Sequence, residues 1–445
     1  MMVKRQRKLD GLSCCVVPRE LIQRIALFVA DSATFFSYLR AFVTADVLGD
    51  LEHFLWLRRW LPNEIVWPYF GFREIPPQRM LPVLRTIADK YQFAIQLDFG
   101  DENDISWLEP AFQPQTLILS KLPEHVSSFD HIFTMSRLRT LTLSCVEPHV
   151  ISLLLKCVRE SNLTALTFGP TSALLSPPDI EHLVYWLANQ PVRRLAWSGW
   201  RFHVERDPDV LQTLYQALFD CRTLQDVKID ATLLVALEQF AFYTPLTMHS
   251  LVLTQCGLPS SALATLAAGL PGSNLHTLVL QQRKWASVDH MPSIHAFREF
   301  AAALPKTKLQ KIVLHGFLVG DRGCWHLRKA LPLTRTLTHL DLTSCHITDA
   351  GAALLGAALH EAPTALWRLI LSYNYISSDG VTRLIQAMGS STCPRPTLIV
   401  KAATRLYYWM PVIKDAIQNH PKVNVITTQL AISNLMPKEP KLWIF

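Results

Sequence analysis

The clearest hydrophobic pattern in the chain lies between residues 337 and 376, where it occurs twice. The segment LTHLDLTSCHI places apolar residues at Leu337, Leu340, Leu342 and Ile347, and LWRLILSYNYI repeats that spacing from Leu366. Leucines at every second position predict a short strand with one buried face, because successive side chains of a strand point to opposite sides. The segments that follow, TDAGAALLGAAL and SSDGVTRLIQAMG, are interpreted as helices. Each copy therefore predicts one strand followed by one helix.

The same strand pattern recurs along most of the chain. Its copies start at residues 138, 163, 192, 224, 248, 275, 309, 337 and 366, so that eight intervals span 228 residues with a mean of 28.5. Cys345 and Asn374 follow two of these strands, where a side chain that bonds free backbone groups closes the turn.

This pattern, L-x-x-L-x-L-x-x-(N/C)-x-(L/I), resembles the leucine-rich repeat. The period resembles the ribonuclease-inhibitor type, in which an α-helix lies on the convex side of every repeat. The resemblance covers roughly residues 115 to 400. It implies an α/β fold, a horseshoe-shaped solenoid with a parallel sheet and convex helices, and it implies little about function.

Residues 17–60 show three short apolar stripes at helical spacing and predict a small all-α unit ahead of the repeats. Proline suits the first position of a helix, so Pro18 is predicted there. The segment VPRELIQRIALFVAD resembles the opening helix of an F-box, and FFSYLRAFVTADVLGDLEHFLWL resembles its second and third helices. The resemblance implies docking to the small adaptor subunit of a cullin-RING ligase through Pro18, Leu21, Ile22 and Ile25. The alternative is a helical cap that shields the first repeat.

The remaining segments complete the predicted domain organisation. Residues 1–16 form a basic flexible tail, residues 61–114 a helical, proline-rich connector and N-terminal cap, residues 115–430 the repeats, and residues 431–445 a C-terminal tail. FAIQLDF (93–99) and TLILS (116–120) are interpreted as degenerate first strands. TLIVK (397–401) and VNVITT (423–428) are interpreted as the last strands, with a helix between them.

Composition narrows the class of protein. Hydrophobic residues make up 49% of the 445 residues and charged residues 18%, which argues against extended disorder. The net charge of +7 is spread along the chain without a concentrated basic face, so nucleic acid is not an expected partner. No apolar run is long enough to span a membrane, and no apolar segment of a secretory signal follows the basic start. Nine cysteines without framework spacing favour a reducing compartment, so we expect a cytoplasmic protein, with a nuclear location as the alternative.

Motifs for chemistry are missing from the sequence. It contains no nucleotide-binding glycine motif, no phosphate loop, no zinc-protease motif and no serine-hydrolase elbow. Its 16 histidines are scattered singly. We therefore expect no enzyme activity, no cofactor and no metal site.

In a repeat solenoid, the strand residues that alternate with buried leucines face the concave side. This predicted face is polar and of mixed sign, which suits a protein partner, because charges set specificity and association rate. Loops after the strands add aromatic and basic residues, and Trp285 is the strongest binding candidate because Arg283 and Lys284 precede it. The predicted partner-binding residues on the face and loop rim are Arg194, Trp197, Trp200, Asp226, Lys228, Arg283, Trp285, His315, His339, Asp341, Arg368 and Tyr373. The alternative is that loop rings fill the core where the Asn or Cys plug is missing, as Trp200 would.

The predicted function is a protein–protein interaction module, and more specifically the substrate-recognition subunit of a cullin-RING ubiquitin ligase. In that hypothesis the helices dock the adaptor, the horseshoe holds the protein substrate, and proximity takes the place of catalysis. A repeat scaffold or sensor without a ligase link is the first alternative. A GTPase-activating protein similar to the Ran regulator is the second, with Arg201 or Arg283 presented by a loop.

Overall fold

The structure, a computed structural model, divides into two compact units, Met1–Cys145 and Val146–Phe445. It describes residues 18–61, 66–67, 69–72, 77–91, 94–98, 108, 114–120, 132–202, 208–234, 236–258, 260–282, 294–361, 365–391, 393, 396–401 and 406–427. The two predicted tails, 1–16 and 431–445, lie outside these residues. No helix among the described residues is long and apolar enough to cross a membrane.

The first unit begins with a helical part. It consists of α1 (Arg19–Leu27), α2 (Ser32–Phe42), η1 (Val43–Ala45), η2 (Gly49–Leu51) and α3 (Glu52–Leu57). Pro18 is the N-cap and not the first helical residue, because its ψ of 141° is extended and its carbonyl accepts from Leu21 N at 3.0 Å. Asp31 caps α2, and its carboxylate accepts from Thr34 N at 2.7 Å.

Aromatic rings fill the core of this helical part. Phe35 stacks on Trp67 with ring centroids 3.7 Å apart, and Phe54 meets Phe35 edge-on at 5.3 Å. Phe36 and Leu39 are buried beside them. The aromatic residues of α2 therefore supply the volume that a core of only three short helices needs.

Four parallel strands follow in the first unit. They are β1 (Phe70–Phe72), β2 (Ile95–Leu97), β3 (Thr116–Leu119) and β4 (Thr140–Leu143), with η3 (Gln78–Met80) and α5 (Leu81–Tyr91) between β1 and β2. The predicted strands at 93–99 and 116–120 correspond to β2 and β3, but the strand pairing begins at Phe70, earlier than the predicted start of the repeats at residue 115. Pattern alone missed β1 because each short strand buries only two residues, Phe70 and Phe72 in this case.

The second unit is a parallel sheet with helices along one side. Its sheet runs in the order β5 (Ala165–Pro170), β7 (Arg194–Ser198), β9 (Asp226–Asp230), β10 (Ser250–Thr254), β11 (Thr277–Gln281), β12 (Lys311–His315), β13 (His339–Asp341), β14 (Arg368–Ile370), β15 (Thr397–Ile399) and β16 (Asn424–Ile426). Each of these strands lies in a segment that the repeat pattern predicts. A separate pair joins β6 (Leu174–Leu175) to β8 (Arg201–Phe202).

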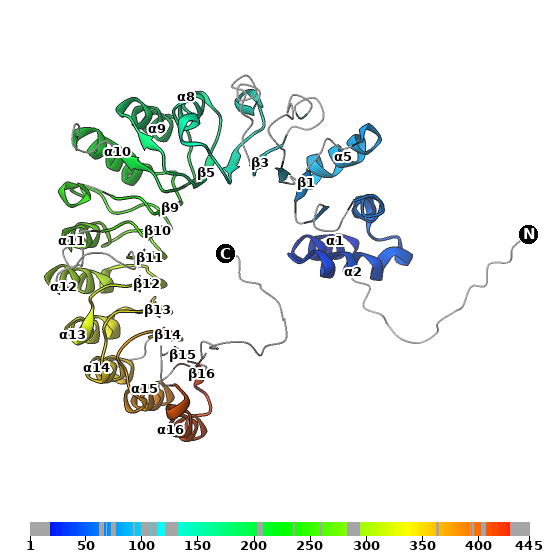
Figure 1. Cartoon of the computed structure of the whole chain (residues 1–445). Helices are drawn as coiled ribbons and strands as arrows, with labels where there is room; N and C mark the ends of the chain where they lie inside the picture. The colour runs from blue at the N-terminus through cyan, green and yellow to red at the C-terminus, as the bar shows by residue number, and fades with distance from the viewer. Residues whose placement is uncertain are drawn as a thin grey trace, which may run out of the picture. The chain divides into compact units, whose positions relative to one another are not determined.

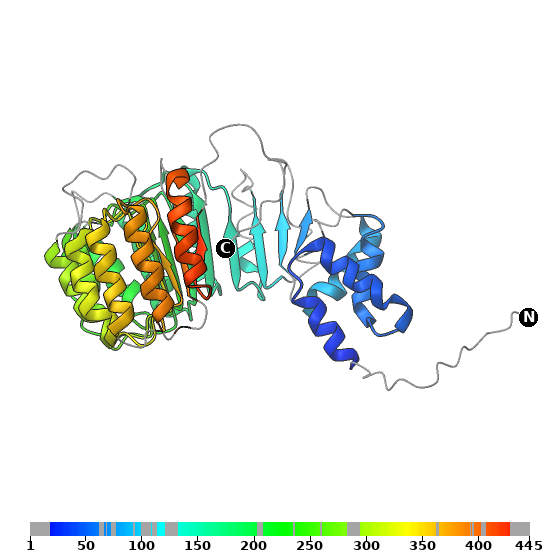
Figure 2. The ribbon, with the colours of Figure 1, turned by 90° about the horizontal axis from the view of Figure 1, so that it is seen from below.

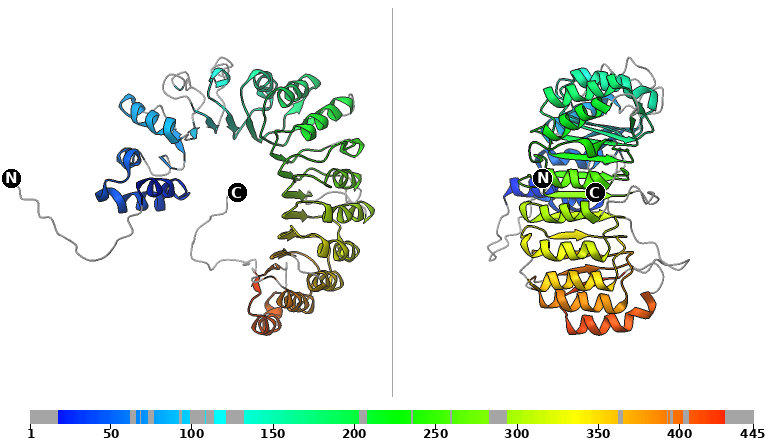
Figure 3. Two further views of the ribbon diagram at one scale, coloured as in Figure 1. Left: turned by 180° about the vertical axis from the view of Figure 1, so that it is seen from behind. Right: turned by 90° about the vertical axis from the view of Figure 1, so that its left-hand side faces the viewer.

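Helices follow most strands of the second unit. They are η4 (Pro148–Val150), α8 (Ile151–Glu160), α9 (Pro177–Asn189), α10 (Pro208–Asp220), η5 (Leu237–Gln239), α11 (Ser260–Gly269), α12 (Ile294–Ala303), η7 (Leu304–Lys306), α13 (Gly320–Ala330), η8 (Leu331–Leu333), α14 (Asp349–Glu361), α15 (Ser378–Ser390) and α16 (Leu406–Asn419). In this unit the strands line the inner side of a curve and the helices the outer side (Figure 1). The helices α13 to α15 lie side by side over the sheet, as Figure 2 and the right-hand view of Figure 3 show.

Hydrogen bonds from polar plugs close the turns of the regular repeats. Asn374 Oδ1 accepts from Cys345 N at 2.9 Å and Ile347 N at 3.0 Å, and Asn374 Nδ2 donates to Leu342 O at 2.8 Å. Cys345 Sγ donates to Leu314 O at 3.0 Å, in strand β12 of the preceding repeat. The predicted plug role of both residues is confirmed, because buried backbone groups need partners.

A second ladder of hydrogen bonds links the starts of neighbouring helices. Asp349 accepts from Ser377 N at 2.7 Å, just before α15 begins. Gly380 permits this approach, since a Cβ at that position would lie 2.2 Å from Asp349 Oδ1. Asp321 accepts in the same way from Gly351 N at 2.9 Å at the start of α14. These contacts explain the aspartates in the first turns of α13 and α14 and the glycines in the first turns of α14 and α15.

The repeat between β9 and β10 departs from the ribonuclease-inhibitor resemblance. Among the residues that the structure describes there, 231–234 and 236–249, the one helical element is η5. Aromatic rings of the preceding helix and of this segment pack together where the resemblance implies a full helix: Phe219 lies 5.4 Å from Phe240 and 5.1 Å from Phe242. The repeat that starts at residue 224 is therefore also the shortest, because the short η5 needs fewer residues than a full helix to reach the next strand.

Candidate functional site

The inner face of the second unit presents three rows of side chains across the sheet. Adjacent parallel strands pair in register, so residues at the same strand position lie side by side. In β10, for example, Leu251 and Leu253 are buried toward the helices, whereas Ser250, Val252 and Thr254 are partly exposed. The predicted alternation of inner-facing and buried residues is confirmed from β9 to β14, whereas in β7 the inner-facing Ala196 is buried.

The first row holds most of the positive charge. In strand order it is Arg194, Asp226, Ser250, Thr277, Lys311, His339 and Arg368.

The central row is mainly apolar. In the same order it is Ala196, Lys228, Val252, Val279, Val313, Asp341 and Ile370. The three valines stand on consecutive strands, and all three are partly exposed. Strands lie about 4.8 Å apart, so the valines form a continuous apolar stripe of about 10 Å between Lys228 and Asp341.

The third row is polar. It consists of Ser198, Asp230, Thr254, Gln281 and His315. Apolar contacts in the centre with polar groups on both sides are the usual arrangement of a protein-binding surface.

Hydrogen bonds within the face already engage its aspartates. Asp226 pairs with Arg194 at 3.4 Å across β7 and β9, and both side chains are exposed, so this pair adds little stability. Asp230 accepts from Ser198 Oγ at 2.8 Å and from Thr254 Oγ1. Asp341 Oδ1 accepts from Thr343 N at 2.9 Å.

Lys311, His339 and Arg368 occupy neighbouring first-row positions on β12, β13 and β14. Burial is the main cause that lowers the pKa of His339 to about 4, and the positive charges of Arg368 and Lys311 contribute to the same shift. His339 is therefore neutral at pH 7. The Nε atom of Arg368 is buried and has no hydrogen-bond partner among the described residues.

Aromatic residues stand before and after β14. Trp367, directly before β14, is 43% exposed, and its ring centroid lies 6.4 Å from that of His339. Tyr373, after β14, is 41% exposed and has a left-handed φ of 58°. Its backbone N–H donates to Lys401 O at 2.7 Å, which holds the turn in place. Sequence reasoning selected Tyr373 but missed Trp367, whose only signal is its position beside the strand.

Two predicted rim residues belong to the core. Trp197 lies inside β7 and not in the loop after it, and both Trp197 and Trp200 are buried. Their rings stack with centroids 5.0 Å apart, and Trp200 also lies 5.0 Å from Phe168. The turn after β7 has Gly199-Trp200 where later repeats have Cys or Asn, so rings fill the space of the missing plug. The prediction that these two tryptophans bind a partner is wrong.

The structure places the other predicted binding residues in three different situations. Arg283 and Trp285 lie outside the described residues. Arg201 is exposed but lies in β8, where its N–H donates to Ala173 O at 2.8 Å, so it does not stand on a loop. In the helical part, Ile22 is buried and cannot dock an adaptor, whereas Pro18, Leu21 and Ile25 are exposed.

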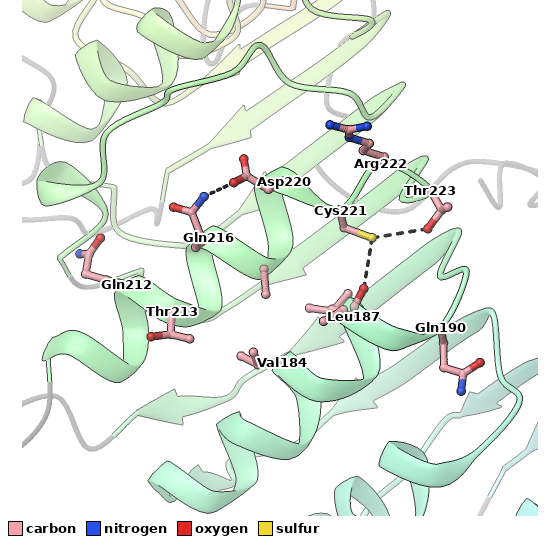
Figure 4. A pocket seen from close by; sticks show the side chains of 12 residues that line it. Val184, Leu187, Gln190, Gln212, Thr213, Gln216, Asp220, Cys221, Arg222 and Thr223 are labelled. Carbon is pink, nitrogen blue, oxygen red and sulfur yellow. Dashed lines mark hydrogen bonds between the residues drawn. The ribbon is translucent and has the colours of Figure 1, made fainter.

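A shallow hollow of about 760 Å³ lies on the outer side, between α9 and α10. Val184 and Leu187 form part of its apolar lining, and Gln216 and Asp220 stand at its rim (Figure 4). Cys221 donates its thiol to Leu187 O at 3.5 Å. No group of three or more potential metal ligands occurs among the described residues.

Repeated strand–helix units around one curved parallel sheet define the second unit as a leucine-rich-repeat solenoid of the α/β class. A family model described as "Leucine Rich repeat" matches residues 335–356, which contain β13 and the start of α14.

A curated relative is the "NACHT, LRR and PYD domains-containing protein 5" of Homo sapiens. It is 31% identical over 146 residues, a match that covers 32% of this chain. The match spans only 12% of the length of that relative. Among solved structures, an internalin from Listeria monocytogenes aligns with 13% identity and a TM-score of 0.32, over 68% of this chain and 74% of the internalin.

Proposed function

We propose that this chain is a protein-binding module whose main contact surface is the inner face of the second unit. One observation carries the proposal: the in-register valine stripe, Val252, Val279 and Val313, with Lys228 at one end and Asp341 at the other. An exposed apolar strip bordered by charge allows a partner to bury apolar area while charged groups select its orientation.

Photo-crosslinking tests this surface in the full chain. A benzoylphenylalanine in place of Thr277, on the inner face, is expected to give reproducible cross-linked products in cells. The matched control places it at Arg322, an exposed residue of α13 on the outer side. Products of equal identity and yield from both positions would contradict the assignment of the inner face.

More specifically, we propose that the helical part of the first unit recruits the small adaptor of a cullin-RING ligase. The support is an exposed apolar group on α1 and its end: Leu21 is 47% exposed, Ile25 41% and Phe28 87%. Large exposed apolar side chains grouped on one short helix are typical of a contact surface. In this proposal the chain supplies no catalytic residue and acts by holding a substrate close to the ligase.

Co-purification with the adaptor subunit tests the finer proposal. The Ile25→Asp variant is expected to lose binding while it keeps its fold, because Ile25 is exposed. The control is Ser37→Asp, an exposed site on α2 with the same change of charge. If the folded wild-type chain does not bind the adaptor, the helical part is a cap for the repeats, and the chain acts as a scaffold or sensor.

A further inference from the structure

We propose that the inner face binds an acidic segment of a protein partner, with a carboxylate seated over His339 between Lys311 and Arg368. The inference rests on the proposed function and adds the chemistry of the partner. The partner's neighbouring apolar side chains would lie on the valine stripe, which begins with Val313 on the same strand as Lys311.

The two cations of this site are free to bind. Among the described residues, neither Lys311 nor Arg368 makes an ion pair within 4.0 Å. By contrast, Asp226 is paired with Arg194, and Asp230 is bonded by two hydroxyl groups. The charge that this face can still offer to a partner is therefore positive.

The register places both cations within reach of one anion. Lys311 pairs with His339, and His339 pairs with Arg368, so the two cations stand two strands apart, or about 10 Å between Cα atoms. Both side chains are long and flexible enough to converge on a group above the smaller imidazole between them. Asp341 lies one row away and already accepts from the Thr343 N–H.

The state of His339 agrees with a local excess of positive charge. Its pKa is held low by burial and by Arg368 and Lys311, the same two residues that would hold the anion. A carboxylate seated over His339 would offset the repulsion between these two cations.

The remaining surface favours a protein over a nucleic acid. Three aspartates, Asp226, Asp230 and Asp341, interrupt the continuous positive track that a phosphate backbone needs, whereas one carboxylate needs only the local pair Lys311 and Arg368. The valine stripe and the exposed ring of Trp367 instead match apolar and aromatic contacts of a peptide.

The test begins with selection of peptides of about twelve residues from a random displayed library on the full-length chain. We expect the selected sequences to be enriched in Asp and Glu interspersed with apolar residues. A selected peptide and its counterpart with Asn and Gln in place of Asp and Glu are then labelled and titrated by fluorescence anisotropy. The acidic peptide is expected to bind at least roughly tenfold more tightly than the amide counterpart and to weaken with added salt.

Charge reversal identifies the site. The double variant Lys311→Glu/Arg368→Glu is expected to reduce affinity by at least about tenfold. The control Arg322→Glu/Arg383→Glu changes net charge equally on exposed residues of α13 and α15 and is expected to change affinity by less than about twofold. Should circular dichroism show that the first variant is unfolded, Lys311→Gln/Arg368→Gln takes its place.

Other outcomes would overturn the inference. Selected peptides without acidic residues, or acidic peptides that bind the double variant as well as wild type, would reject this site, while inner-face cross-linking could still support the proposed function. If a labelled single-stranded oligonucleotide binds wild type more tightly than the peptides do, and the double variant does not bind it, the site is assigned to nucleic acid. A library that yields no binders would exclude short acidic segments as the partner.

Discussion

Two stretches of the second unit hold the same kind of sheet by different means. Between residues 337 and 390 hydrogen bonds of Asn374 and Cys345 close the turns, and regular helices cover the outer side. Between residues 192 and 248 aromatic rings take both places: Trp197 stacks on Trp200 at the turn, and Phe240 packs on Phe219 on the outer side. The comparison shows that a repeat needs a filled turn and a covered outer side, and that polar plugs or rings can meet this need.

The largest expected effect on stability comes from residues 192–248, the stretch that is filled by aromatic rings. Trp200→Ala leaves a cavity beneath the turn after β7 and is expected to lower the free energy of unfolding by about 3 to 5 kcal/mol. Urea unfolding followed by circular dichroism measures it. Trp200→Phe should retain most of the stability, because Trp200 Nε1 has no hydrogen-bond partner among the described residues. The control Trp367→Ala removes an exposed ring, and an equal loss there would show that burial is not the cause.

Loss of the polar plug Asn374, in the stretch of residues 337–390, is expected to have the next largest effect on stability. Asn374→Ala removes the acceptor of the Cys345 and Ile347 N–H groups and the donor to Leu342 O. We expect a loss of about 2 to 3 kcal/mol, because buried backbone groups are left without partners. Amide hydrogen exchange should show the loss first in β13 and β14. Asn374→Cys is expected to be milder, and equal damage from Cys and Ala would mean that Cys345 is not an equivalent plug.

The start of α15 depends on the close approach of Asp349 to Gly380. Gly380→Ala would place a Cβ 2.2 Å from Asp349 Oδ1 and 2.7 Å from Ile376 Cγ2, so the helices must shift. We expect a loss of about 1 to 3 kcal/mol in thermal unfolding. Gly356→Ala is the matched control, since its Cβ would lie 3.3 Å from Ala387 Cβ and alanine favours the helix. A similar loss at both glycines would rule out the contact with Asp349 as the cause.

The smallest expected effect is the pH dependence of the inner face. His339 has a folded pKa of about 4, below the ordinary value of 6.5, because of burial and the nearby Arg368 and Lys311. The unfolded chain therefore binds more protons between these values, so stability falls as pH drops from about 6.5 toward 4. Because His339 is partly exposed, we reduce the full effect of its pKa shift, and its contribution to the loss of the free energy of unfolding is about 1 to 2 kcal/mol.

The midpoints of urea unfolding at pH 7 and pH 5 measure this contribution of His339 to stability. The His339→Asn variant is expected to lose less stability than wild type over this interval. If wild type and His339→Asn lose the same stability between pH 7 and pH 5, other groups account for the acid sensitivity.

Much of the repeat architecture could be predicted from sequence. Alternating leucines such as Leu340 and Leu342 specify strands, because a slip of one residue would expose the buried set. From these strands the register, and with it the inner-facing residues, followed correctly. The sequence also contains the plugs Cys345 and Asn374 in recognisable form, since few side chains can bond backbone donors and acceptors in a tight turn.

Other features depended on contacts between distant residues. Sequence alone did not show that Ile22 is buried while Ile25 is exposed, because one short helix has several apolar faces and only the packing of its neighbours selects one. It also missed that η5 is the one helical element among the described residues between β9 and β10, since rings from α10 and the loop could fill that volume in several ways.

The sequence by itself determined the period, the strands and the alternation of buried and inner-facing residues, because these depend on local spacing along the chain. Only the tertiary structure decided that Trp197 and Trp200 belong to the core, and that Lys311, His339 and Arg368 form one basic group. The physical reason is that both results depend on which residues of successive repeats come side by side. That arrangement arises when about thirty residues of strand, turn and helix bring one repeat against the next.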